Sequence, residues 1–288
     1  MWGVLPLYFE ALKSLSPLVM LAHRIVWSVP TALAVIVAFG QLAALRAALA
    51  RPRLLGLLAA SALLLAVNWT VYIWAVASGR VLEGSLGYFI NPLISFLFAA
   101  LMFNERFSRV QLAALGLAAA GVVNQTLVVG AFPWVSLTLA WTFAAYGVLR
   151  KRASVDSGVG FGVEAALLAP FALAFLALQP AAASPGGLWG LSLETPGRTA
   201  LILLAGPVTA LPLILFALGA RRLRLSTIAM LQYIAPTLQF LIGLGLGERF
   251  TPGHAVTFGC IWIGVALFTL DVLRADRRRA RATAVELG

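Results

Sequence analysis

Two charged residues, Arg24 and Glu164, lie inside long apolar stretches of this sequence, residues 17–39 and 159–178. A charge in an apolar medium is costly, so such residues usually face a polar interior and act on ions, protons or charged ligands. A guanidinium attracts an anionic or polar ligand. A carboxyl whose charged form is disfavoured by burial can take a proton from one side and release it to the other. The pattern therefore predicts proton carriage by Glu164 and substrate attraction by Arg24.

Both charges also allow structural interpretations. The Arg24 side chain is long enough to reach lipid headgroups, and Glu164 could do no more than hydrogen-bond a neighbouring helix. Each charge precedes a proline by six residues, Pro30 and Pro170 respectively. The two stretches therefore resemble equivalent parts of a duplicated chain.

Two other prolines, Pro92 and Pro236, lie in apolar stretches at an offset of 144 residues and are flanked by polar side chains at helical spacing. Each proline frees a backbone carbonyl, and paired interruptions at corresponding positions are typical of transporter substrate sites. The alternative is that the prolines only kink the helices and the amides only bond neighbouring helices. The side chains that we expect to line one cavity are those of Tyr88, Asn91, Gln232 and Gln239.

Asn68 and Tyr146 are further candidates for the lining of this cavity. Asn68 shares one helical face with Ser61 and Tyr72, and Tyr146 follows Thr142 by four residues. Either side chain could equally join two helices. Both are kept as predicted substrate contacts.

The composition indicates a polytopic membrane protein. Hydrophobic residues make up 61% of the 288 residues and charged residues only 11%, whereas soluble domains carry about 25% charged residues. The net charge is +11. We therefore expect the basic residues to lie between spans and to orient them in the bilayer, and we expect no nucleic-acid partner.

Sequence motifs of enzymes are absent. No glycine precedes either lysine, so there is no phosphate-binding P-loop, and neither HExxH nor GxSxG occurs. Two histidines and one cysteine make a metal site improbable. We expect neither catalysis nor a cofactor.

Apolar stretches long enough to span a bilayer recur along the chain, since a span needs ~20 residues. Residues 1–12 are too short, and we expect them to be the second half of a first helix whose start lies in an upstream coding sequence. The other nine predicted spans are 17–39, 54–76, 82–103, 110–128, 133–149, 159–178, 199–219, 225–246 and 253–272.

The basic residues predict the orientation of these ten helices. Sixteen of the 21 lysines and arginines fall in alternate loops on one side, and four on the other, which places the first side and both termini in the cytoplasm. Five helices per repeat is an odd number, so the repeats, residues 1–128 and 129–272, must be inverted, with 273–288 a frayed basic cytoplasmic tail. Arg24 and Glu164 then lie roughly 10 Å apart along the membrane normal, and we expect no direct ion pair between them.

Four runs of residues resemble a known family: LAHRIVWS (21–28), NWTVYIWA (68–75), LEGSLGYFINPL (82–93) and LQYIAPTLQF (231–240). They are similar to the RarD-type permeases of the EamA group, in the drug/metabolite transporter superfamily. The resemblance covers nearly the whole chain. It implies ten helices in two inverted five-helix repeats and export from the bacterial cytoplasm, and members often carry the label chloramphenicol-sensitive protein.

The expected fold is thus an all-α membrane protein with ten transmembrane helices, the first truncated, in two inverted five-helix repeats. The expected function is secondary active, proton-coupled export of small metabolites or drugs across the bacterial inner membrane, by alternating access around a midplane cavity. Its partners would be a small-molecule substrate, the lipid bilayer and a proton gradient. An uncoupled channel or facilitator of the same fold is the alternative.

Overall fold

The computed structural model describes residues 1–103, 108–127, 130–179, 188–191, 194–222 and 233–286, and every regular element in these ranges is a helix. In chain order the elements are η1 Trp2–Val4, α1 Leu5–Ala11, α2 Pro17–Ala38, α3 Leu42–Leu49, α4 Pro52–Ala77, α5 Val81–Phe103, α6 Arg109–Leu127, α7 Trp134–Arg152, α8 Ser157–Leu178, η3 Leu188–Gly190, α9 Pro196–Leu203, α10 Ala205–Arg222, α12 Ile234–Gly245 and α13 Pro252–Glu286.

Five of the described helices are long and apolar enough to cross a membrane: α2, α4, α6, α8 and the Pro252–Ala275 part of α13. Their mean hydropathy lies between 1.4 and 2.0. The prediction of an all-helical membrane protein is confirmed at this level.

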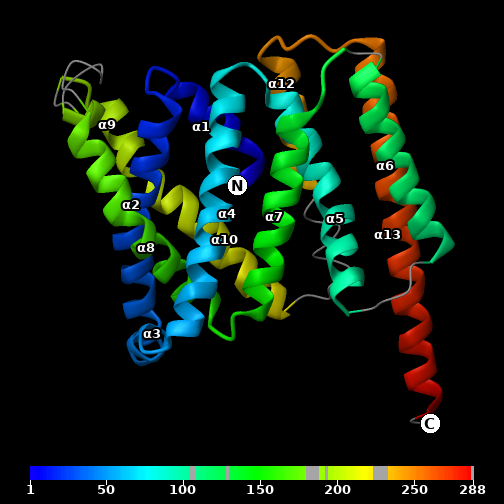
Figure 1. Ribbon diagram of the computed structural model, residues 1–288, viewed down its shortest axis with the longest axis horizontal. Helices are drawn as coiled ribbons and strands as arrows, with labels where there is room; N and C mark the ends of the chain where they lie inside the picture. Colours follow the sequence, from blue (N-terminus) through cyan, green and yellow to red (C-terminus); the bar gives the residue numbers. More distant parts are fainter. Residues whose placement is uncertain (104–107, 128–129, 180–187, 192–193, 223–232, 287–288) are drawn as a thin grey trace.

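The long helices stand side by side, with α2 and α8 at one end of the molecule and α6 and α13 at the other (Figure 1). Helices α4, α7 and α5 lie between them, and α7 packs against both of its neighbours. One buried apolar cluster is centred on α1, α2 and α4, and a second joins α5, α6, α12 and α13.

The helices add to the predicted spans or differ from them in three places. The loop before α4 contains the short helix α3, whose leucines and alanines are strong helix formers. The predicted span 199–219 is two helices, α9 and α10, which meet at Leu204. Helix α13 extends beyond the predicted span 253–272 and ends at Glu286, because the alanine and arginine residues of the tail also favour a helix.

The two matched prolines differ in their surroundings. Helix α5 continues through Pro92, whereas Pro236 lies in the first turn of α12, where a missing backbone N–H removes no helical hydrogen bond. The described parts of the two helices therefore do not contain the matching interruptions that the sequence predicted. Gln232, predicted to lie on the same face as Pro236, is outside the described residues.

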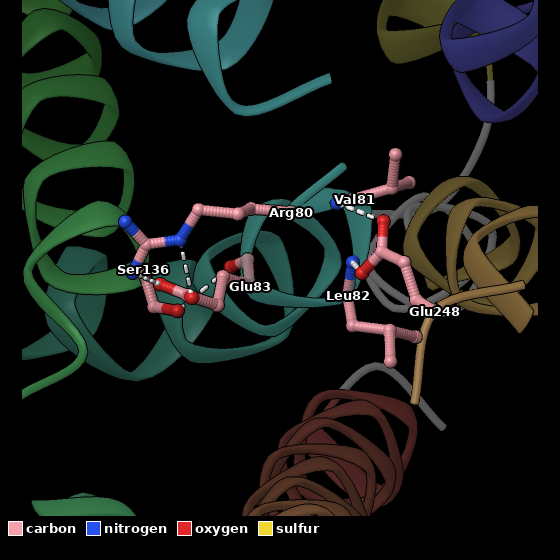
Figure 2. Close-up of polar contacts among 6 residues, drawn as sticks. All are labelled: Arg80, Val81, Leu82, Glu83, Ser136 and Glu248. Atoms are coloured by element: carbon pink, nitrogen blue, oxygen red, sulfur yellow. Dashed lines mark hydrogen bonds and ion pairs between the residues drawn. The ribbon is translucent and has the colours of Figure 1, made fainter. Parts of the chain in front are cut away.

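The start of α5 is held by a carboxylate from the other end of the chain (Figure 2). Glu248 accepts hydrogen bonds from the backbone N–H groups of Val81 and Leu82, the latter at 2.9 Å. An acidic group at a helix N-terminus satisfies free donors and complements the helix dipole. Burial raises the pKa of the Glu248 carboxyl, and these two N–H donors act in the opposite sense. Glu248 thus acts as a helix-end charge for α5.

Two further contacts hold the first turn of α5 in Figure 2. Arg80 Nε lies 2.6 Å from Glu83 Oε1, and Ser136 Oγ on α7 donates to the Glu83 carbonyl oxygen at 2.7 Å. The start of α5 is therefore tied to both α7 and the segment after α12.

Replacing Glu248 with alanine should lower the stability of the folded protein, because it leaves two buried N–H groups at the start of α5 without an acceptor. We expect a loss of ~1–3 kcal/mol, seen as a fall of several degrees in the apparent Tm of the detergent-purified protein. The matched control is Glu10→Ala. Glu10 forms an ion pair with Lys13, in which the Lys13 side chain is 64% exposed and the Glu10 side chain 30%. Such an exposed pair contributes little to stability. Equal effects of the two substitutions would contradict the capping role.

Candidate functional site

Helices α2 and α8 form a matched pair that carries the two intramembrane charges. Each has 22 residues and an internal proline, and each places its charged residue eighth in the helix. The helices pack against each other in opposite directions (Figure 1), and Gly162 near the start of α8 faces Ile36 near the end of α2. Arg24 and Glu164 therefore lie near opposite ends of this pair, each ~10 Å from the start of its helix.

Glu164 is enclosed by side chains from two other helices. The carboxylate is 1% exposed. Ser61 Oγ on α4 lies 2.5 Å from Oε1, and the Tyr146 hydroxyl on α7 donates to Oε2 at 3.5 Å. Arg150 Nη1, also on α7, lies 3.6 Å from Oε1. We call Glu164, Ser61, Tyr146 and Arg150 the carboxylate cluster.

Arg150 is a candidate site residue that the sequence analysis did not single out, because it counts among the 16 basic residues assigned to the loops of one side. Its side chain is 14% exposed and points toward Glu164. A Cβ on Gly160 would collide with the Arg150 guanidinium, so the glycine lets that group lie across α8. The i, i+4 spacing of Tyr146 and Arg150 places both on one face of α7, and this was the available signal.

Arg24 is buried in different surroundings. It is 5% exposed, and its Nε donates to Thr209 Oγ1 on α10 at 2.8 Å. The guanidinium carbon lies 4.1 Å from the centroid of the Trp69 ring and 5.6 Å from that of Phe9, distances at which cation–π attraction acts. Arg24 Nη1 has no hydrogen-bond partner. Its binding partners differ from those of Glu164, so the two charges do not pair with each other.

A close backbone contact places Thr209 beside Arg24. Gly206, three residues before Thr209, lies against the carbonyl of Trp27 on α2, and a Cβ at this position would overlap that carbonyl. Thr209 Oγ1 also donates to the Ala205 carbonyl at 2.8 Å, which leaves its lone pairs for Arg24.

The amide side chains predicted to line a cavity bond neighbouring elements. Asn68 Nδ2 donates to the Leu139 carbonyl at 3.0 Å and to Thr142 Oγ1 at 2.9 Å. Asn91 Nδ2 donates to the Ala140 carbonyl at 3.1 Å, and Gln239 Nε2 to that of Trp2 at 3.1 Å. These contacts are those of side chains that join helices.

Tyr88 connects the amides to the aromatic residues. Its hydroxyl donates to Asn68 Oδ1 at 3.3 Å, and its ring packs edge-on against Tyr72 and Phe143 at centroid distances of 5.4 and 6.2 Å. The structure thus brings Asn68 and Tyr88 together, whereas Gln239 lies against η1. A shared cavity between the repeats stays a prediction.

A pocket of about 660 Å³ opens where α4 begins and α7 ends. Its lining includes Arg51, Arg53 and Arg152, together with Leu57, which is four residues before Ser61 on α4. The pocket is therefore a basic vestibule one helical turn away from the carboxylate cluster.

The position of Arg150 across α8 predicts a sign change in a double-mutant experiment. Gly160→Ala should destabilise the protein by ~1–3 kcal/mol, because the methyl group displaces a buried guanidinium. In an Arg150→Ala background the same substitution should instead stabilise by up to about 1 kcal/mol, since alanine favours a helix over glycine. Thermal unfolding in detergent measures both. Gly147→Ala on α7, where a Cβ meets nothing within 4 Å, is the control. A Gly160→Ala effect that is independent of Arg150 would contradict the geometry.

Comparison with known proteins gives a consistent family. The model of the EamA-like transporter family matches residues 1–125. An uncharacterized transporter of Bacillus subtilis, YojE, is 43% identical over 286 residues, which cover 96% of this chain and 92% of the relative. Protein RarD of Escherichia coli is 37% identical, with 97% and 94% covered. The chloramphenicol-sensitive protein RarD of Pseudomonas aeruginosa is 36% identical, with 96% and 92% covered.

A solved structure described only as a protein crystal structure superposes with a TM-score of 0.62, covers 93% of each chain and is 22% identical. That likeness supports the fold alone. The identities of 36–43% over nearly the full length carry the assignment. This chain belongs to the RarD-type permeases of the EamA-like transporter family.

Proposed function

We propose that this protein is a secondary active transporter that exports small metabolites or drugs across the bacterial inner membrane in exchange for protons. The observation that carries the proposal is the carboxylate cluster, in which a buried carboxyl meets a serine, a tyrosine and an arginine from two neighbouring helices. Relatives whose names say that they are transporters come from the bacteria Bacillus subtilis and Vibrio cholerae.

The proposed architecture is ten spanning helices in two inverted repeats, residues 1–128 and 129–272, with both termini in the cytoplasm. Its support is the pairing of helices. If the repeats correspond, α2 matches α8, α5 matches α12 and α6 matches α13, and each of these matched helices packs against its own counterpart. A two-fold axis in the membrane plane would produce such pairs.

The hydroxyl of Ser61 suits a carboxyl that changes its protonation state. Ser61 Oγ lies 2.5 Å from Glu164 Oε1 and 2.9 Å from the Leu58 carbonyl oxygen, both within hydrogen-bond distance. A serine has one proton to donate. It can donate to an ionised Glu164, or it can accept from a protonated Glu164 and donate to the Leu58 carbonyl. Neither protonation state leaves Ser61 without a partner.

Protonation would weaken the contact between α7 and α8. Ionised Glu164 attracts Arg150, which lies near the end of α7 that faces the basic vestibule. A neutral Glu164 loses this attraction, and the Arg150 side chain is then free to turn toward water or lipid headgroups. Proton uptake from outside would therefore open the cytoplasmic side, and proton release there would let it close again.

In the proposed cycle a different contact would close the opposite side. His23 precedes Arg24 in the chain, and its Nε2 lies 2.7 Å from the carbonyl oxygen of Trp189 in η3. Trp189 has a φ of 60°, in the left-handed region that bulky residues rarely adopt. Such strain persists where the surroundings hold it. We assign this contact as the outer closure of an alternating-access cycle.

The proton mechanism predicts loss of gradient-driven transport in Glu164→Gln. Glutamine keeps the size and a hydrogen-bonding amide but cannot bind and release a proton. In proteoliposomes with an imposed pH gradient, and with a compound panel that includes chloramphenicol, we expect gradient-driven accumulation of substrate to be lost, because the variant exchanges no proton for the substrate. Purified protein and reconstituted amounts are matched.

The control is Glu10→Gln, which replaces a partly exposed carboxylate on α1. This variant should transport as the wild type does. Unchanged pH dependence in Glu164→Gln would remove Glu164 from the mechanism. Wild-type transport that ignores the pH gradient would instead favour the uncoupled facilitator.

The proposed orientation predicts the side of two reporters. A reporter fused after residue 288 should be cytoplasmic, and one inserted at residue 184 should be external, because the basic residues gather in the loops on the side of the C-terminus. Accessibility of single-cysteine labels to impermeant reagents in whole cells measures both. Two reporters on the same side would refute the ten-helix arrangement.

A further inference from the structure

Arg24 is a buried cation that no carboxylate of the described residues is found to compensate. The chain has ten acidic residues. Six of them bind other groups in the structure: Glu10, Glu83, Asp156, Glu164, Glu248 and Asp271. The contacts of the Arg24 guanidinium are with the Thr209 hydroxyl and the rings of Trp69 and Phe9. A buried charge without a counter-ion is costly, so its retention points to a ligand.

Two buried donors, one on Arg24 itself and one on a neighbouring tyrosine, lack hydrogen-bond partners. Arg24 Nη1 and the Tyr72 hydroxyl make no hydrogen bond, and their residues are 5% and 1% exposed. Both side chains lie against Phe9: the guanidinium carbon is 5.6 Å from its ring centroid, and the Tyr72 ring is 6.0 Å away. Buried donors without partners are rare in folded proteins. Others occur among the described residues, Trp27 Nε1 and Arg150 Nη1 among them. The donors of Arg24 and Tyr72, however, belong to side chains that contact the same ring, that of Phe9.

We infer that Arg24 Nη1 and the Tyr72 hydroxyl bind the carboxylate of a small organic monoanion, and that this anion is the substrate class. The inference rests on the proposed transport function. One positive charge and two free donors match one carboxylate with its two oxygens, whereas a phosphate dianion brings more charge and three terminal oxygens. The rings of Phe9 and Trp69 lie against the guanidinium, and the ring of Tyr88 lies against that of Tyr72. Such rings suit an apolar or aromatic body.

The positions of neighbouring groups explain how the site stays ready for a ligand. Thr209 holds Nε, and Trp69 covers one face of the guanidinium at 4.1 Å. The guanidinium is thus fixed with Nη1 unused, which reduces the entropy lost on binding. Arg51, Arg53 and Arg152 line the vestibule at the opposite end of the bundle, where a basic surface would concentrate anions before they enter.

The test uses the full-length protein in detergent, without any gradient, so that it is independent of coupling. Acetate, benzoate and cinnamate are the carboxylate probes, benzamide is the neutral match for benzoate, and phenylphosphonate is the dianionic one. We expect calorimetric binding and a saturable rise in apparent Tm with benzoate or cinnamate, none with benzamide, and a smaller rise with phenylphosphonate.

Three variants separate ligand binding from folding. Arg24→Met keeps an apolar chain against Trp69 and should weaken binding of the carboxylate by about tenfold or more, with an apparent Tm that is unchanged or higher without ligand, since an uncompensated charge has been removed. Tyr72→Phe removes only the unpaired hydroxyl and should weaken binding by about threefold to tenfold. Arg80→Gln is the matched control. Arg80 also lies near a tryptophan ring, 5.3 Å from that of Trp74, but has Glu83 as its partner. This variant should bind the carboxylate as the wild type does.

Several outcomes would overturn the inference: no binding of any carboxylate probe, tighter binding of phenylphosphonate than of benzoate, equal binding by Arg24→Met, or an equal loss in Arg80→Gln. These outcomes leave the transport proposal standing if pH-driven transport of another compound is found in proteoliposomes. Binding that follows the expected pattern, with no transport under any gradient, would sink the transport proposal and leave the carboxylate site in place.

Discussion

A carboxylate enclosed among apolar helices has to be compensated by the protein itself, and Glu164 fixes much of the arrangement around it for this reason. Its partners come from α4 and α7, so three helices meet at one point. The approach depends on Gly160, whose missing side chain leaves room for the guanidinium of Arg150. The lengths and directions of α4, α7 and α8 allow Ser61, Tyr146 and Arg150 to meet Glu164 at this point.

The same helix pair carries a contrasting charge at its other end. Arg24 occupies in α2 the position that Glu164 occupies in α8, but its partners are a threonine and aromatic rings rather than a carboxylate. The charge at one end of the pair therefore has an oppositely charged partner, Arg150, whereas the contacts of Arg24 are uncharged. This asymmetry would allow the two positions to take the different roles proposed for them, one in binding and one in coupling.

Elsewhere in the described bundle, three amide side chains serve to join helices. Asn68 and Asn91 on α4 and α5 both donate to backbone carbonyls of α7, and Gln239 does the same to η1. In an apolar medium such bonds contribute about 0.6–2 kcal/mol each. Glu248 adds a bond of another kind, across a long sequence separation, to the first turn of α5. A helix bundle held by a few polar contacts can exchange one set for another, which a transport cycle requires.

The sequence by itself determined the membrane class, most helix positions, the family, and the two buried charges Arg24 and Glu164, because apolar stretches and the charges within them are properties of a linear segment. It also placed Ser61, Asn68 and Tyr72 on one face of α4, since helical periodicity fixes faces. Only the tertiary structure decided that Arg150 turns inward to Glu164, that Asn91 and Gln239 bond main-chain carbonyls, and that Thr209 and Trp69 hold Arg24. The physical reason is that periodicity shows which side of a helix is polar but not which other helix meets that side, and this depends on close contacts such as those at Gly160 and Gly206.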